Sequence, residues 1–126
     1  MAAIRDIVFD CRHPASLARF WAEALDGYDV APYDEAELER LAAAGLSGPE
    51  DDPTVLVEGR AGPRLWFQLV DEGKVVKNRV HLDLRSEDIA AEVERLVQLG
   101  ATELHRVGSR VTMADPEGNE FCIDRS

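Results

Sequence analysis

Apolar and polar residues alternate along several short stretches of the chain, with the period of two that is typical of β-strands. In residues 4–11 (IRDIVFDC), Ile7, Phe9 and Cys11 fall on one face and the intervening residues fall on the other. The same alternation occurs in residues 79–85 (RVHLDLR). Apolar runs between turn signals predict further strands at residues 54–58, 65–70, 102–107, 110–114 and 121–124.

Apolar residues at helical spacing predict two main helices. The first begins at Pro14, which suits the first helical position, and extends to about residue 25. Its apolar stripe includes Trp21, whose spacing assigns it to the core. The second is expected to be capped by Ser86 and to end at Gly100, since glycine commonly terminates helices.

A weaker helix is expected over residues 34–44, in the part of the chain between the first main helix and the next strand. Asp34 is the expected N-cap, and Gly45 marks the end. Leu38 and Leu41 are expected to face inward. This helix is interpreted as a flap near the mouth of a binding cleft.

The second half of the chain repeats the order of elements of the first half. Each half is interpreted as one βαβββ module, with module one at residues 1–72 and module two at residues 78–126 of a single domain, 1–126. One module alone exposes the apolar side of its sheet, so two modules are expected to pack into one α+β domain. The expected architecture is a curved mixed sheet around a central cleft.

The helices are expected to cover only one face of this sheet, which leaves the other face for a binding cleft. Strand parity places a mostly polar set of side chains on that second face. This set comprises Asp6, Val8, Asp10, Trp66, Gln68, His81, Asp83, Arg85 and Cys122. Polar residues on the concave side of a sheet indicate a solvated cleft.

Composition and charge narrow the possible partners. The chain has 126 residues, of which 45% are hydrophobic and 31% charged, as in soluble globular domains. Its formal charge of −11 disfavours nucleic acid as a partner. No long apolar run predicts a membrane span, and Asp6 interrupts the N-terminal segment before a secretion signal forms. With only two cysteines, a cytoplasmic location is expected.

Several segments together resemble a known family. They are LWFQ at residues 65–68, KNRVHLDL at 77–84, VERLVQLGA at 93–101 and ADPEGNEFCI at 114–123. With the duplicated unit, they resemble the glyoxalase-like branch of the vicinal oxygen chelate superfamily, which includes glyoxalase I, bleomycin-resistance proteins and extradiol dioxygenases. The resemblance implies the paired-module fold, a small-molecule ligand and a homodimer.

The resemblance also implies positions for metal ligands, on the first and last strands of each module. These positions fall on Asp6, on Gln68 or Trp66, on His81 and on Cys122. Only His81 is of the usual type, because Cys122 stands where the family commonly has Glu. A cleft without metal is therefore favoured over one that holds a divalent ion such as zinc, nickel or iron.

The candidate cleft residues have both functional and structural interpretations. His81, oriented by Asp83, is the candidate catalytic pair, and otherwise His81 is a neutral histidine bonded to a neighbour. Trp66 faces away from the helices and suits a flat ligand, and Gln68 is a second candidate ligand contact. Asp6 is either a cleft residue or an exposed carboxylate at the end of its strand. Cys122 is either a ligand contact or a small buried side chain.

Three functions follow from these alternatives. The first is a protein that binds a small planar or aromatic molecule through Asp6, Trp66, Gln68, His81 and Cys122, for example to sequester a drug. The second is an enzyme, either a lyase, isomerase or dioxygenase with a divalent metal, or a metal-free enzyme using His81 and Asp83. The third is an interaction module with a vestigial cleft.

Overall fold

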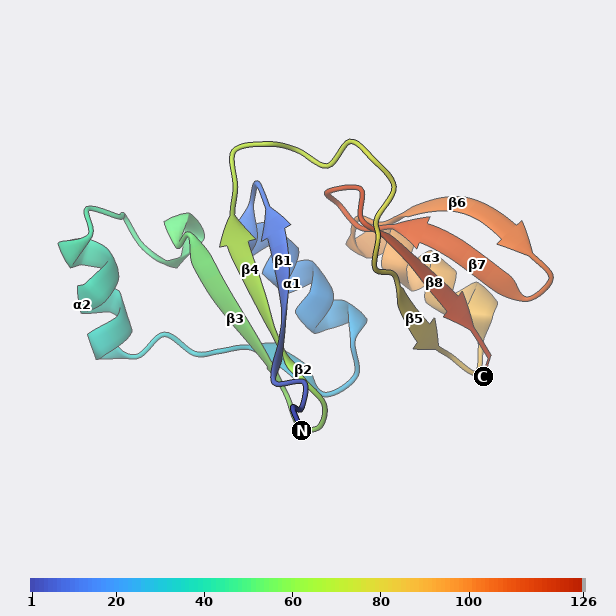
Figure 1. Ribbon diagram of the computed structural model, residues 1–126, viewed down its shortest axis with the longest axis horizontal. Helices are drawn as coiled ribbons and strands as arrows, with labels where there is room; N and C mark the ends of the chain where they lie inside the picture. Colours follow the sequence, from blue (N-terminus) through green and yellow to red (C-terminus); the bar gives the residue numbers. More distant parts are fainter. Residues whose placement is uncertain (126) are drawn as a thin grey trace. The chain divides into compact units, whose positions relative to one another are not determined.

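The computed structural model describes residues 1–125, which form two compact units. Unit 1 ends at Gly73 and unit 2 begins at Lys74. Each unit contains one four-stranded mixed sheet and follows the order strand, helix and three strands (Figure 1). The predicted fold class, α+β with two βαβββ modules, is confirmed.

Unit 1 contains four strands and two helices. They are β1 (Asp6–Cys11), α1 (Pro14–Ala24), β2 (Tyr28–Val30), α2 (Glu35–Ala43), a short 3-10 turn (Pro49–Asp51), β3 (Thr54–Gly59) and β4 (Arg64–Leu69). The strand order is β1-β4-β3-β2, with β1 parallel to β4 and the other pairs antiparallel. In Figure 1, α1 lies against this sheet, whereas α2 stands beyond its edge.

Unit 2 repeats this arrangement without a second helix. Its elements are β5 (Leu82–Arg85), α3 (Ile89–Leu99), β6 (Thr102–Val107), β7 (Arg110–Ala114) and β8 (Glu120–Asp124). The strand order is β5-β8-β7-β6, with β5 parallel to β8. The bounds predicted for β6 and β7 are confirmed. The turn between them places Gly108 at φ 61°, a conformation that favours glycine.

Aromatic side chains join α1 to the sheet of unit 1. The ring of Phe9 stacks on Phe67 with centroids 5.0 Å apart and contacts Trp21 of α1 at 5.5 Å. Trp21 is only 1% exposed, as its helical spacing predicted. Because side chains alternate along β1 and β4, this packing directs Val8 and Trp66 to the face that α1 does not cover.

The turn before the last strand is built around a buried carboxylate. Asp115 Oδ1 accepts hydrogen bonds from the backbone N–H groups of Glu117 and Asn119 at 2.9 and 3.0 Å. Asp115 Oδ2 accepts one from Asn119 Nδ2 at 2.9 Å. Gly118 adopts φ 89°, which completes the tight turn. The DPEGN segment therefore has a structural reason for its residue types.

Several predicted boundaries are wrong. The strand expected from residue 79 begins at Leu82, so His81 precedes the strand. The third helix is capped by Asp88, which accepts from the Ala91 N–H at 3.0 Å, and not by Ser86. The three-residue strand β2 was not predicted. Leu38 of α2 is 44% exposed, although Leu41 is buried and Asp34 caps the helix as expected.

Among the described residues, no helix combines the length and the apolar character needed to cross a bilayer.

The aromatic contact predicts which substitutions destabilise unit 1. Phe67→Ala removes a fully buried ring, and we expect it to lower the free energy of unfolding by about 3–5 kcal/mol in urea denaturation followed by circular dichroism. Val8→Ala, on the uncovered face of the neighbouring strand, is the control and should change it by less than about 0.5 kcal/mol. Equal effects of the two substitutions would contradict the assignment of faces.

Candidate functional site

A pocket of about 400 Å³ lies on the uncovered face of the unit 1 sheet, next to α2. The volume falls within the range of small-molecule sites. Its floor comes from β3 and β4, and its other walls come from the segment after β2 and from α2. The lining residues are Ala31, Pro32, Tyr33, Glu37, Arg40, Asp52, Thr54, Leu56 and Trp66.

The paired strands β3 and β4 form the floor of this pocket, which we call the Trp66 pocket. Leu56 of β3 lies directly opposite Trp66 of β4, so both side chains point to the same face. Thr54 lies opposite Gln68, two pairs further along the ladder and therefore on the same face. The floor therefore combines an aromatic ring, an aliphatic side chain and a hydroxyl group.

A buried carboxylate forms the polar edge of the Trp66 pocket. Asp52 is 3% exposed, and its Oδ2 accepts a hydrogen bond of 2.7 Å from the Tyr33 hydroxyl. Its Oδ1 accepts from the Thr54 backbone N–H at 3.0 Å. Burial, followed by the hydrogen bond to Asp52, raises the pKa of Tyr33, so its phenol remains a neutral donor at physiological pH.

One arginine connects α2 to this edge. Arg40 Nη2 lies 2.8 Å from Glu37 Oε2 on the same helix and 3.8 Å from Asp52 Oδ2. The hydrogen bond to Glu37 raises the pKa of Arg40. The Trp66 pocket thus offers a ring surface beside paired charges and hydroxyl groups. Such a site recognises a flat molecule that carries polar substituents.

Asp6 makes ion pairs with two arginines. Its Oδ1 lies 2.8 Å from Arg64 Nε, and its Oδ2 lies 3.2 Å from Arg64 Nη2 and 2.8 Å from Arg5 Nε. The hydrogen bond from Arg64 lowers the pKa of the Asp6 carboxyl. Arg64 in turn lies over the ring of Trp66, with Cζ 5.8 Å from the ring centroid.

The predicted residues of unit 2 form two separate arrangements. His81 is exposed, and its Nε2 donates to the Asn78 carbonyl at 2.7 Å. Asp83 instead accepts from Arg110 Nη2 at 3.1 Å. Within residues 1–125, no hydrogen bond joins His81 to Asp83, so the expected orienting contact is absent from the described structure.

Cys122 lies beside Asp83 on the uncovered face of the unit 2 sheet, because the two residues are cross-strand partners. Its side chain is nearly buried, and Sγ lies 3.5 Å from Thr112 Oγ1. The Cys122 sulfur and then Asp83 raise the pKa of Arg110. Of the predicted residues, the structure thus groups Asp6 with Trp66 in unit 1, and Asp83 with Cys122 in unit 2.

Gln68 is exposed on the same face as Trp66 but does not line the Trp66 pocket. The central cleft predicted from the two modules, with Gln68 and His81 among its lining residues, stays a prediction. Sequence reasoning did not assign Tyr33, Arg40 or Asp52 to a site. The only signal for them is their position around the helix that was interpreted as a flap.

Two of the predicted metal ligands, Asp6 and His81, have other partners in the described structure. Both carboxylate oxygens of Asp6 bind guanidinium groups, and His81 Nε2 donates to a carbonyl. Over residues 1–125, neither unit brings together three His, Cys, Asp or Glu side chains that could hold a metal ion. A metal ion bound at Asp6 would have to displace both arginines from its carboxylate.

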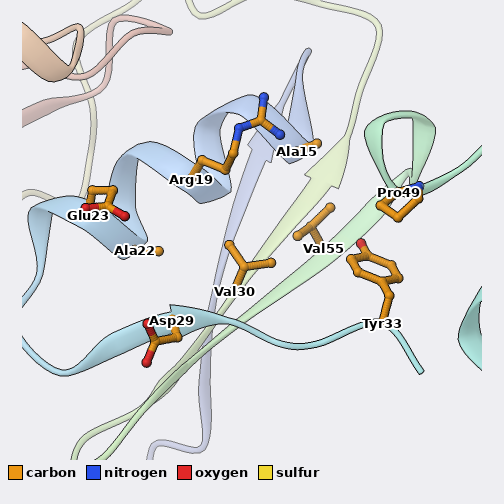
Figure 2. A pocket seen from close by; sticks show the side chains of 9 residues that line it. All are labelled: Ala15, Arg19, Ala22, Glu23, Asp29, Val30, Tyr33, Pro49 and Val55. Carbon is orange, nitrogen blue, oxygen red and sulfur yellow. The ribbon is translucent and has the colours of Figure 1, made fainter.

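A second pocket, of about 430 Å³, lies on the covered side of the unit 1 sheet (Figure 2). Val30 and Val55 lie between α1 and the strands, with Tyr33 at one end. Arg19 at its rim forms a two-point ion pair with Glu50, at 2.8 and 3.0 Å. Tyr33 therefore lines both pockets.

The segment before β5 is held to unit 2 by one carboxylate. Glu120 accepts hydrogen bonds of 3.0 Å from Lys74 Nζ and from the Asn78 backbone N–H. Burial opposes the ionisation of Glu120, but the Asn78 and Lys74 donors outweigh it and lower the pKa to about 2. Because His81 bonds to Asn78, Glu120 also fixes the position of His81.

The profile of the glyoxalase-like domain family matches residues 6–123. The chain therefore belongs to the glyoxalase-like domain family, in agreement with the resemblance seen in its sequence. No curated protein sequence matches the chain.

Solved structures with the same fold have low sequence identity to this chain. The oxidase ChaP-H2 is 20% identical with a TM-score of 0.63, covering 100% of this chain and 95% of its own. A glyoxalase/bleomycin resistance protein/dioxygenase family enzyme from Burkholderia phytofirmans PsJN is 14% identical with a TM-score of 0.64, covering 97% of each chain. A possible glyoxalase from Bacillus cereus is 11% identical with a TM-score of 0.66, covering 98% of this chain and 99% of its own. These similarities establish the fold alone.

The lowered pKa of Glu120 predicts an acid-sensitive contribution to stability. Its carboxylate is stabilised in the folded state, so this contribution is complete above the ordinary pKa of 4.5 and is lost as the pH falls towards about 2. We expect Glu120→Gln to lower stability at pH 7 in urea denaturation, and the difference from the wild type to shrink below pH 4.5. Glu94→Gln, at an exposed position on α3 of the same unit, serves as the control. A difference that is constant from pH 7 to pH 3 would contradict this assignment.

Proposed function

We propose that this protein binds a small planar or aromatic molecule in the Trp66 pocket, without requiring a metal ion. The observation that carries this proposal is the indole of Trp66 in the floor of a pocket of about 400 Å³, on the sheet face that α1 leaves uncovered. An aromatic ring packs on an indole by offset stacking, which contributes binding energy beyond the area it buries.

The polar edge of the pocket supports the same proposal. The Thr54 hydroxyl and the Arg40 guanidinium lie within one pocket with the Trp66 ring. A ligand whose ring stacks on Trp66 places its substituents towards these groups. The polar groups then fix the orientation of the ligand more than they strengthen its binding. We also propose that the protein forms a homodimer and is located in the cytoplasm, as expected from the sequence.

Removal of the indole tests ring binding directly. We expect Trp66→Ala to weaken the binding of quinoline, used as a neutral planar probe, by about tenfold, because a stacked aromatic pair contributes roughly 0.5–1.5 kcal/mol beyond the buried area. Isothermal titration calorimetry at pH 7 measures the change. Leu38→Ala, on α2 but outside the pocket lining, is the control and should leave the dissociation constant unchanged. If the wild type binds no quinoline, or if Trp66→Ala binds it as well as the wild type, this proposal is wrong.

The metal-independent part of the proposal has its own test. Because both oxygens of Asp6 already bind arginines, we expect treatment with EDTA to leave quinoline binding unchanged. His81→Ala should also leave it unchanged, since His81 is not among the lining residues. If EDTA abolishes binding and His81→Ala reproduces this loss, the metal-dependent alternative is supported instead.

A further inference from the structure

A cation already lies over the Trp66 ring, which forms part of the floor of the Trp66 pocket. Arg64 and Trp66 are two residues apart on β4, so they share the uncovered face of the sheet. Arg64 Cζ lies 5.8 Å from the centroid of the Trp66 ring, within the range of cation–π attraction. Arg64 itself does not line the pocket.

Asp6 holds this guanidinium in place from the neighbouring strand. Asp6 of β1 is the direct partner of Arg64 in the parallel ladder, and the two side chains form two hydrogen bonds, at 2.8 and 3.2 Å. Asp6 is 11% exposed, so water competes little for its oxygens. A two-point pair between a carboxylate and a guanidinium fixes orientation as well as distance.

We propose that Arg64, held by Asp6, positions the Trp66 ring and makes the Trp66 pocket select neutral rings over cationic rings. Asp6 then acts as a positioning residue through Arg64, which differs from the metal-ligand role that the family resemblance implied. This inference rests on the proposed function for its selectivity. The positioning of Trp66 is independent of any ligand.

The selectivity follows from local charge. The formal charge of −11 attracts cations to the protein at long range. The pocket lining adds two carboxylates, Glu37 and Asp52, against one guanidinium, Arg40, so these charges by themselves favour a cationic ring over a neutral one. The Arg64 guanidinium over Trp66 repels a second cation that approaches the same indole. It also already occupies the cation–π interaction that the ring can offer. Discrimination against cationic rings therefore depends on Arg64 and not on the overall charge.

Fluorescence quenching tests the positioning step without a ligand. The chain has two tryptophans, and the spectrum of Trp66→Phe isolates the signal of the buried Trp21. We expect Arg64→Met to increase the quenching of Trp66 by acrylamide, because the indole loses its cover. Asp6→Asn should have the same effect, and the double variant should add nothing further. Arg60→Met removes an equal charge from unit 1 outside the Trp66 pocket and is the matched control.

Two matched probes test the selectivity. Quinoline is neutral at pH 7, and N-methylquinolinium is a cation of nearly the same shape. We expect the wild type to bind quinoline more tightly, and Arg64→Met to shift the ratio of the two dissociation constants by about two- to fivefold towards the cation, as expected for one cation–π contact. Arg64→Lys keeps the charge and should retain most of the selectivity, and Arg60→Met should leave the ratio unchanged.

The outcomes separate this inference from the proposed function. If neither probe binds the wild type, the proposed function and the selectivity are both wrong, while acrylamide quenching still decides the positioning step. If quinoline binds but Arg64→Met leaves the ratio of dissociation constants unchanged, the selectivity is wrong and the proposed function stands. If Arg64→Met and Arg60→Met change the quenching of Trp66 equally, the positioning role of Arg64 is wrong.

Discussion

The ring of Phe9, which stacks on Phe67 and contacts Trp21, determines which face of the unit 1 sheet is available for binding. These rings attach α1 to one side of the sheet, and strand alternation then sends Trp66 to the other side. A one-residue shift in the register of β4 would exchange Phe67 and Trp66 between the two faces. The Trp66 pocket therefore depends on core packing that contains none of its lining residues.

Alternation in the sequence predicted the faces of the strands better than their ends. In residues 79–85 the parity was correct, because Leu82 and Leu84 lie on the face opposite Asp83. The ladder starts only at Leu82, whose partner is Phe121, because the carboxylate of Glu120 accepts the Asn78 N–H and holds the preceding residues outside the sheet. This competition involves residues 42 positions apart, which local periodicity does not include.

For the candidate site as well, alternation in the sequence predicted the face on which a strand residue lies, but not the residues that come from outside the strands. Parity identified Trp66, since it depends only on neighbouring residues in one strand. Tyr33, Arg40 and Asp52 come from a segment with a three-residue strand, a weakly apolar helix and a loop, where no period favours one orientation. Their roles arise from the burial of Asp52 and from its hydrogen bond to Tyr33, which lies 19 positions away in the chain.

The position of Tyr33 links the two pockets of unit 1. Its phenol is a wall of both, and its hydroxyl is fixed by Asp52 at 2.7 Å. A rotation of this ring that enlarges one pocket narrows the other and breaks the hydrogen bond to a buried carboxylate. The shapes of the two pockets therefore depend on each other. A ligand that displaces the Tyr33 ring on one side of the sheet also changes the space available to a ligand on the other side.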